Sequence, residues 1–220
     1  MANILITGSN RGIGRELAER LSARGDNVLA CARKDAPDGP NLSPITLDVT
    51  DQQSLAGLAQ RLKDHSLDLL VCNAGVLHGR GGIDDPVYTA ETFAESFAVN
   101  VTGVFLTIRA CLPAIRRAGG HIAVITSQMG STERAKGGAY SYRASKAAAT
   151  NLAISLSKEL AAEGIAVSAF HPGWVRTDMG GGDADVSVED SAAGLIARFD
   201  ELSMANTGSF TFYSGEAIPF

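Results

Sequence analysis

Cysteine and histidine are scarce in this chain, and their scarcity excludes several kinds of protein. Only three cysteines occur, Cys31, Cys72 and Cys111, each in an apolar context. An odd number of widely spaced cysteines does not suggest a disulfide framework, so we expect free, buried thiols in a reducing cytoplasm. The four histidines show no metal-ligand spacing, so no metal is predicted.

A basic balance and a long apolar run are also missing. The net charge of -5 argues against a nonspecific nucleic-acid binder, which normally carries a basic patch. Residues 1–6 lack the charged n-region of a signal peptide and lead straight into a short apolar strand. No apolar run approaches the roughly 20 residues that span a bilayer. We therefore expect a cytoplasmic protein with neither a nucleic-acid nor a membrane partner.

Short apolar runs alternate with longer helical patterns along the whole chain. With 220 residues and no linker or repeat, one domain over residues 1–220 is expected. Strands are predicted at 3–7, 27–32, 44–47, 67–72, 120–126, 165–170 and 209–212, and helices at 13–23, 51–63, 90–118, 140–163 and 188–202. Pro113 is expected to kink the third helix or to begin its last turn. Strands that are apolar on both faces and alternate with helices indicate a doubly wound, mostly parallel α/β fold of the Rossmann type.

A glycine-rich turn joins the first predicted strand to the first helix. Its members are Gly8, Asn10, Arg11, Gly12, Ile13 and Gly14. Glycines let the backbone approach a pyrophosphate, and the helix N-terminus supplies N–H donors. An ordinary tight turn is the alternative, and the position between strand and helix favours a dinucleotide site.

The end of the second strand indicates which dinucleotide binds. A carboxylate there would accept a hydrogen bond from the 2′-hydroxyl of NAD, but this chain has Arg33 and no acid until Asp35. Arg11 in the glycine turn is a second cation that could hold a 2′-phosphate. The alternative is that both arginines are solvated surface charges. The pair, with the acid missing, favours NADPH over NADH.

Tyr142 and Lys146 are four residues apart on a predicted helix, and Ser127 lies upstream. Residues at this spacing share one helix face. The ordinary pKa of a tyrosine phenol is about 10, and an ammonium beside it lowers that pKa by favouring the phenolate. The pair could therefore exchange a proton near neutral pH. Taken singly, each residue has a structural explanation. Together they favour hydride chemistry on a carbonyl or alcohol.

In order and spacing these motifs resemble the short-chain dehydrogenase/reductase family over nearly the whole length. The resemblance adds Asp48-Val49, Asn73-Ala74-Gly75, Asn100 and Pro172-Gly173 with Thr177. The helix around Tyr142 and the C-terminal sequence look most similar to the C-factor-like and sniffer-like carbonyl-reductase branch.

The resemblance implies a role for each catalytic residue. Tyr142 would be the general acid in carbonyl reduction, and Lys146 would lower its pKa and hold the nicotinamide ribose. Ser127 would bond the substrate oxygen, and Asn100 would hold a water that links Lys146 to solvent. The cofactor would carry the hydride. Ser127 as a satisfied strand-end hydroxyl, and Asn100 as a buried amide or cap, are the alternatives.

The same resemblance implies the remaining coenzyme contacts. Asp48 would accept from the adenine amino group, with Val49 beside the base. The backbone of Asn73, Ala74 and Gly75 would approach a ribose. Thr177 would meet the nicotinamide carboxamide or act as a helix N-cap. The full set of expected coenzyme residues is Gly8, Asn10, Arg11, Gly12, Ile13, Gly14, Arg33, Asp48, Val49, Asn73, Ala74, Gly75, Tyr142, Lys146, Pro172, Gly173, Val175 and Thr177.

Two segments depart from the family pattern. Ser127 and Tyr142 are farther apart than usual, so residues 130–138 are expected to loop out beside the pocket. The segment after Thr177 is short, which suggests either an open pocket with broad substrate tolerance or catalysis that depends on a partner to close the pocket.

The leading hypothesis is an NADPH-dependent reductase of a small hydrophobic aldehyde or ketone, acting as a homodimer. The alternative is a nucleotide-binding regulatory protein of the C-factor type. A methyltransferase is disfavoured because it would not explain Ser127, Tyr142 and Lys146 together.

Overall fold

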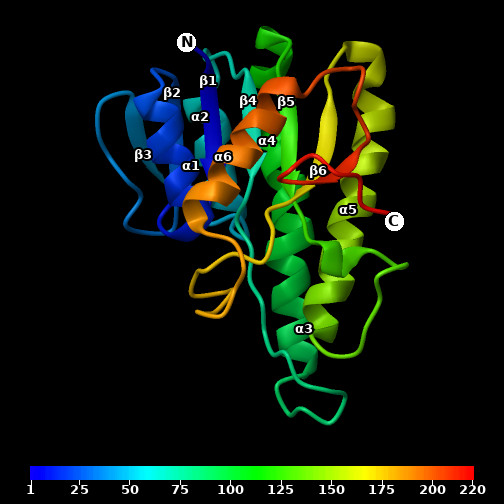
Figure 1. Ribbon diagram of the computed structural model, residues 1–220. Helices are drawn as coiled ribbons and strands as arrows, with labels where there is room; N and C mark the ends of the chain where they lie inside the picture. The colour runs from blue at the N-terminus through cyan, green and yellow to red at the C-terminus, as the bar shows by residue number, and fades with distance from the viewer.

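The computed structural model describes all residues, 1–220, and centres on one seven-stranded parallel sheet (Figure 1). The strand order is β3-β2-β1-β4-β5-β6-β7. The strands are β1 (Asn3–Thr7), β2 (Asn27–Ala32), β3 (Leu42–Thr46), β4 (Leu69–Cys72), β5 (His121–Ile125), β6 (Val167–His171) and β7 (Phe210–Phe212). The predicted fold class, a doubly wound parallel sheet, is confirmed.

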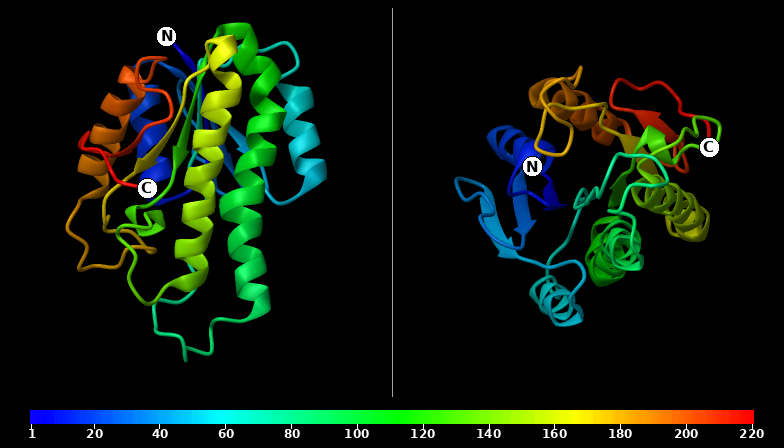
Figure 2. Two further views of the ribbon diagram at one scale, coloured as in Figure 1. Left: turned by 90° about the vertical axis from the view of Figure 1, so that its right-hand side faces the viewer. Right: turned by 90° about the horizontal axis from the view of Figure 1, so that it is seen from below.

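Helices cover both faces of the sheet, as the two views of Figure 2 show. They are α1 (Gly12–Ala23), α2 (Gln52–Arg61), α3 (Ala90–Phe97), α4 (Val104–Ala118), α5 (Tyr140–Leu160) and α6 (Val188–Glu201). One apolar core packs α2, α4 and α5 on the sheet, and a second packs α1 and α6 on the opposite face. Both faces of the sheet are therefore buried, and this burial explains why the strands are apolar on both faces.

The strand limits follow the predictions to within two residues at most ends, and the third strand shows why the ends are hard to place. It begins at Leu42, before the predicted 44, and Pro44 lies inside it in register with Ala30. Proline lacks the N–H that a central strand must donate, but β3 is at the sheet edge, where that loss is tolerated.

The long predicted helix over 90–118 is continuous but changes its winding. A π-helical segment, Ala98–Gly103, separates α3 from α4. The kink expected at Pro113 is not the main irregularity, because α4 continues past Pro113 to Ala118 and ends at Gly119 in the left-handed region. The departure from α geometry lies a dozen residues earlier, where residue 100 is placed.

The same helix corrects one expectation from the sequence. Ala90–Ala118 is long and apolar enough to cross a membrane by length and composition alone, so the prediction that no such stretch exists was wrong. Its apolar residues Val104, Ile108, Cys111 and Ile115 are buried against the sheet. A helix that covers the core of a parallel sheet meets the same criterion.

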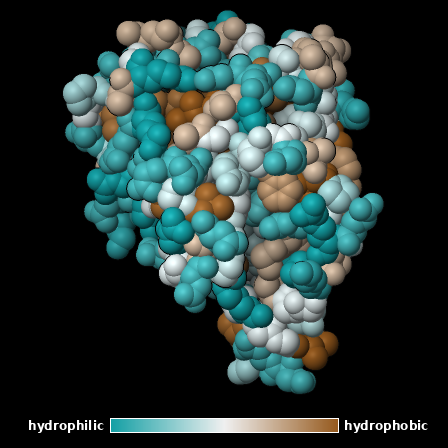
Figure 3. Space-filling model, viewed as in Figure 1, coloured by the Kyte–Doolittle hydropathy of each residue, from teal (hydrophilic) through white to brown (hydrophobic).

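The strand order reverses between β1 and β4, and ligands in open α/β sheets bind outside the carboxyl ends of the strands at this point. The loops that follow the strands gather at the lower end of the molecule in Figure 1. The surface in the same view is mostly hydrophilic, with separate apolar groups rather than one large patch (Figure 3).

Candidate active site

A cleft of about 970 Å³ opens where the strand order reverses. Of the predicted site residues, the cleft is lined by Gly8, Asn10, Arg11, Gly12, Ile13, Gly14, Arg33, Val49, Asn73, Ala74, Gly75, Tyr142, Lys146, Pro172 and Thr177. The structure thus brings together Gly8 and Thr177, which are 169 positions apart in the chain. Asp48, Asn100, Ser127, Gly173 and Val175 do not line it and lie beside or beneath it.

The glycine turn packs too closely for side chains. A Cβ on Gly14 would lie 2.3 Å from the carbonyl oxygen of Gly8, and Gly8 itself has φ +70. Asn73 Nδ2 donates to the carbonyls of Thr7 and Gly8 at 2.9 and 3.2 Å. The Thr7 hydroxyl accepts from the backbone N–H groups of Asn73 and Ala74, both at 3.0 Å. Asn73 therefore fixes the turn through its side chain.

The first turn of α1 is prepared for an anion. Arg11 is its N-cap residue but makes no capping bond, and no acidic residue lies in the turn. Its N–H donors are therefore free of side-chain caps, as a phosphate site requires.

At the end of the cleft next to β2, the lining contains the expected cation, Arg33, and a second cation that the sequence reasoning missed. Arg33 lines it together with Lys34, the next residue in the chain. Asp48 lies beside this end, and its Oδ1 accepts from the Thr50 hydroxyl at 2.7 Å and the Thr50 backbone N–H at 2.9 Å. These two bonds lower the pKa of Asp48.

Arg11 lies in the cleft but does not join Arg33 in a two-arginine clamp. Its guanidinium pairs with Asp178 at 2.9 Å, and both side chains are largely exposed. An exposed pair of this kind contributes little to stability, about 0–1 kcal/mol, so Arg11 can be drawn to another anion at small cost. Sequence reasoning missed Asp178, although it follows Thr177 directly.

Tyr142 is almost fully buried, on the first turn of α5. Burial raises the pKa of the Tyr142 phenol, while a hydrogen bond with Ser127 and the charge of Arg80 oppose that rise. The net shift is upward, so the phenol keeps its proton at neutral pH. Ser127 follows β5 and also accepts from the Met129 N–H at 3.1 Å. The two residues predicted to contact the reacting oxygen are therefore adjacent.

Lys146 lies one turn further along α5 and donates from Nζ to the Ile125 carbonyl at 2.9 Å. Its Nζ is 5.7 Å from the centre of the Tyr142 ring. Burial lowers the pKa of Lys146 to about 8. The prediction that Lys146 lowers the Tyr142 pKa is not met here, because the opposing influences come from Ser127 and Arg80 and burial outweighs them.

Asn100 lies in the π-helical segment, and both the nitrogen and the oxygen of its side-chain amide form hydrogen bonds. Its Nδ2 donates to the Val76 carbonyl and to the Ser145 hydroxyl, and its Oδ1 accepts from the Val76 N–H, all at 2.9 Å. A Cβ on Gly75 would lie 3.2 Å from this Oδ1 and 3.4 Å from Lys146 Nζ. Asn100 therefore holds the segment after β4 against α5, directly beside Lys146.

The residues after β6 form a wall of the cleft. Gly173 has φ +91, and a Cβ there would press on Val186 and Tyr213. Thr177 does not cap a helix as one reading expected, since the next helix begins at Val188 and is capped by Ser187. Its hydroxyl instead closes a tight turn by accepting from the Gly180 N–H at 3.0 Å.

Of the two segments that depart from the family pattern, the one after Thr177 borders the cleft through Asp178 and Met179, whereas residues 128–139 do not line it. The segment between Thr177 and Ser187 contains no helix. The Trp174 indole donates to the Gly180 carbonyl at 2.8 Å, which holds the segment at one point. The loop between Ser127 and Tyr142 lies against the C-terminal residue, whose carbonyl accepts from the Thr132 hydroxyl at 2.7 Å.

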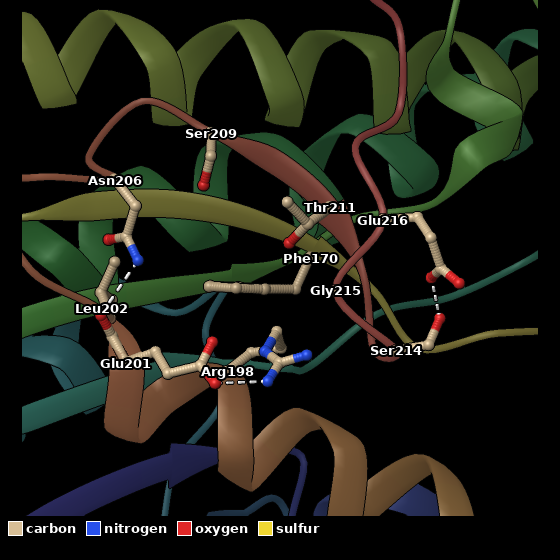
Figure 4. A pocket seen from close by; sticks show the side chains of 10 residues that line it. All are labelled: Phe170, Arg198, Glu201, Leu202, Asn206, Ser209, Thr211, Ser214, Gly215 and Glu216. Carbon is tan, nitrogen blue, oxygen red and sulfur yellow. Dashed lines mark hydrogen bonds and ion pairs between the residues drawn. The ribbon is translucent and has the colours of Figure 1, made fainter.

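A second cavity, of about 500 Å³, lies between α6 and β7 (Figure 4). Its charged groups are partly paired among themselves, because Arg198 pairs with Glu201 at 2.5 Å and the Ser214 hydroxyl bonds Glu216, although Arg198 Nε has no partner. It holds none of the predicted site residues. The candidate chemistry therefore belongs to the first cleft.

The fold and cleft together define a dinucleotide-binding α/β protein. The profile of the short chain dehydrogenase family matches residues 2–185. The chain belongs to the short-chain dehydrogenase/reductase family of enzymes, as predicted.

Among curated relatives, the chain is 32% identical to 1-hydroxy-2-glutathionyl-2-methyl-3-butene dehydrogenase of Rhodococcus sp. (strain AD45), over 98% of each chain. It is 38% identical to C-signal of Myxococcus xanthus, over 70% of this chain and 93% of that protein. Among solved structures, NADPH-bound carbonyl reductase from chicken fatty liver matches with a TM-score of 0.90 and 32% identity, over 100% of this chain and 99% of that one. Carbonyl reductase Sniffer of D. melanogaster matches with a TM-score of 0.94 and 26% identity over the whole of both chains. These matches confirm the predicted branch.

Proposed function

We propose that this protein reduces an aldehyde or ketone to an alcohol with NADPH, using Tyr142 as the general acid. The observation that carries the proposal is the hydrogen bond between the buried Tyr142 and Ser127, because Tyr142 lines the cleft together with Lys146. A regulatory protein that only binds a nucleotide would have no use for this pair.

The residues of the cleft fit a dinucleotide that carries an extra phosphate. Arg11, Arg33, Lys34, Lys146 and Arg176 line it, against Asp178 as the single acid. The uncapped first turn of α1 would hold the pyrophosphate, and Arg33 with Lys34 would hold the 2′-phosphate. The carbonyl reductase of chicken fatty liver, itself NADPH-bound, supports the same choice.

The mechanism follows from the placement of the side chains. When bound, the dihydronicotinamide supplies the hydride. Tyr142 gives its phenolic proton to the carbonyl oxygen as the hydride reaches the carbonyl carbon, and solvent later restores that proton. Ser127 donates a hydrogen bond to the same oxygen, where negative charge grows. Lys146 holds a positive charge beside the tyrosinate that forms, and Asn100 keeps the backbone at Val76 in place.

Replacing Tyr142 tests the proposal. Tyr142→Phe should lower kcat for reduction of a simple aromatic aldehyde by about 10²–10⁴-fold, because proton transfer from a positioned group contributes that much. NADPH affinity, measured by fluorescence titration, should stay within about threefold because only the hydroxyl is lost. Tyr140→Phe is the matched control, since Tyr140 is on the same helix and packs edge-on against Tyr88 at 5.4 Å. Equal rates for wild type and Tyr142→Phe would overturn the assignment.

Further features of the proposal concern substrate, assembly and compartment. Apolar residues in the lining of the cleft, such as Val76, Val99 and Met179, favour a substrate with an apolar body. A homodimer through α4 and α5 is supported by Phe105, which is 39% exposed on α4. The three free cysteines agree with a reducing cytoplasm.

A further inference from the structure

Arg80 lies at the rim of the cleft on a segment that the structure holds firmly. It is in the loop between β4 and α3, which reaches the lowest point in Figure 1. The Tyr88 hydroxyl donates to the Gly81 carbonyl at 2.9 Å. A Cβ on Gly138 would lie 2.7 Å from the Arg80 carbonyl oxygen, so this backbone is in contact with the residues that precede α5. The backbone that carries the Arg80 side chain is therefore held by contacts on both sides.

The guanidinium of Arg80 reaches across the mouth of the cleft. One of its nitrogens donates to the Met179 carbonyl at 2.5 Å, and Met179 lines the cleft. Arg80 thus connects the loop after β4 with the segment after β6, and both of these contribute residues to the lining of the cleft.

No carboxylate of the protein pairs with Arg80. Among the acids of these segments, Asp178 pairs with Arg11, Asp85 Oδ1 accepts from the Val87 N–H at 3.0 Å, and Asp84 forms no ion pair. A guanidinium has five N–H donors in a planar fork that matches a carboxylate. Most of the fork of Arg80 is therefore available to an anion from solvent.

The available cation is close to the reacting group. The charge of Arg80 is one of two influences that lower the pKa of Tyr142 against the effect of burial. Arg80 is at the rim of the cleft and Tyr142 is deeper in it. A single substrate that placed an anionic group at Arg80 and a carbonyl group at Tyr142 would therefore need several bonds between the two groups.

We propose that Arg80 binds the carboxylate of the substrate, so that the preferred substrates are oxo acids with an apolar spacer between the carbonyl and the carboxylate. This inference rests on the proposed function and refines its substrate class from a hydrophobic carbonyl to an anionic one. Arg80 would also set the orientation, because a substrate held at one end by Arg80 presents its other end to Tyr142 and Ser127.

A matched pair of aldehydes tests the inference. 4-Carboxybenzaldehyde and methyl 4-formylbenzoate share the reacting group and the ring, and differ in the charge. With saturating NADPH, wild type should show at least about a tenfold higher kcat/KM for the acid. Arg80→Gln should lower kcat/KM for the acid by about 10–100-fold and leave the ester within about threefold. Glutamine is about two bonds shorter than arginine and loses the bond to the Met179 carbonyl as well as the charge, so the ester is the measure of what the lost tie alone costs.

Arg61→Gln is the control, since Arg61 is exposed at the end of α2 and does not line the cleft, and it should keep the wild-type preference. Equal losses for acid and ester in Arg80→Gln, or no loss for either, would overturn the inference and leave Arg80 as a structural tie or a solvated charge.

Binding gives a second readout that needs no turnover. 4-Carboxybenzaldehyde should bind the NADP⁺ complex of wild type in calorimetry and bind Arg80→Gln at least about tenfold more weakly. Unchanged binding would overturn the inference. If neither aldehyde is reduced by wild type, the proposed function fails, and this titration still decides the role of Arg80.

Discussion

Lys146 is an ammonium group in a place with little solvent. Its pKa of about 8 is below the ordinary 10.5 because burial disfavours the charged form. Below pH 8 the folded and unfolded chains both hold this proton, so the cost of burying the charge is fully present. Between pH 8 and 10.5 the unfolded chain binds more protons, and stability rises with pH. The cost is gone above 10.5.

Lys146→Met should therefore stabilise the coenzyme-free protein at pH 7. The shift corresponds to about 3 kcal/mol, from which the lost hydrogen bond to the Ile125 carbonyl removes about 1–2 kcal/mol, leaving a gain of about 1–2 kcal/mol. Urea unfolding of variant and wild type at pH 7 and pH 10 measures it, and the gain should shrink at the higher pH. A variant less stable than wild type at pH 7 would contradict this account, as would a gain that does not depend on pH.

Arg33 is the residue on which the coenzyme preference depends. Arg33→Ala should weaken NADPH binding by about 10–100-fold, the effect of losing charged hydrogen bonds to a phosphate, and leave NADH binding nearly unchanged. Calorimetric titration with both coenzymes measures this. Arg15→Ala is the control, because Arg15 pairs with Glu19 on α1 at 2.7 Å. If both coenzymes bind equally to wild type, the NADPH assignment is wrong.

For single residues, spacing in the sequence predicts which side chains lie together but does not predict their protonation states. Tyr142 and Lys146 share a helix face as the four-residue spacing requires, and both are buried. Their pKa values depend on how deeply the helix is covered and on neighbours from other segments, such as Arg80. Neither is written in the local pattern, so the expected effect of Lys146 on Tyr142 could not be judged from sequence.

Among the elements, the glycine turn before α1 is the least tolerant of change. In Gly14→Ala the new Cβ would lie 2.3 Å from the Gly8 carbonyl oxygen and 2.4 Å from Asn73 Nδ2. We expect a loss of about 1–3 kcal/mol in the free energy of unfolding and loss of measurable coenzyme binding, tested by urea unfolding and fluorescence titration.

Gly57 provides the matched comparison. It lies inside α2, and a Cβ there would meet nothing within 4 Å. Gly57→Ala should stabilise the protein by about 0.5–1 kcal/mol, because alanine is a better helix former, and should leave coenzyme binding unchanged. Similar effects of the two substitutions would show that packing at Gly14 is not as tight as described.

Hydrophobic periodicity predicts which elements exist, and local chemistry predicts some of their ends. Asp51 caps α2, accepting from the Ser54 N–H at 2.8 Å, and an aspartate at the start of a helical pattern is a typical capping signal. The π-helical segment Ala98–Gly103 was not foreseen. Its side chains still follow an apolar helical pattern, and its distant contacts are the hydrogen bonds of Asn100 with Val76 and Ser145.

For the whole molecule, the alternation of elements predicts the parallel sheet, and the order of motifs predicts where the cleft lies. The sequence could not show the contacts across the cleft, Arg11 with Asp178 and Arg80 with Met179. These join residues about 100 or more positions apart in loops without periodicity, so no local pattern marks them.

The assembly is tested at the same scale. Light scattering after size exclusion should give twice the 22.9 kDa of one chain. Phe105→Glu should shift the mass toward one chain, because a charge would be placed in the proposed α4 interface. Met204→Glu, at a residue 40% exposed after α6, should not change the mass. A single-chain mass for wild type at working concentrations would exclude the homodimer.

The π-helical segment also changes the direction in which the side chains after it point, relative to the side chains before it on the same long helix. Each residue of an α-helix advances the side-chain direction by about 100°, so one additional residue per turn rotates everything after it by that amount. Asn100 can then face α5 while Val104 and Ile108 face the sheet. Deleting one residue from 98–103 would restore an ordinary helix at the cost of this rotation, turning either the amide or the apolar face away from its partner. The chain length of this segment is therefore as tightly constrained as its composition, and a single-residue deletion here should be harder to tolerate than several substitutions.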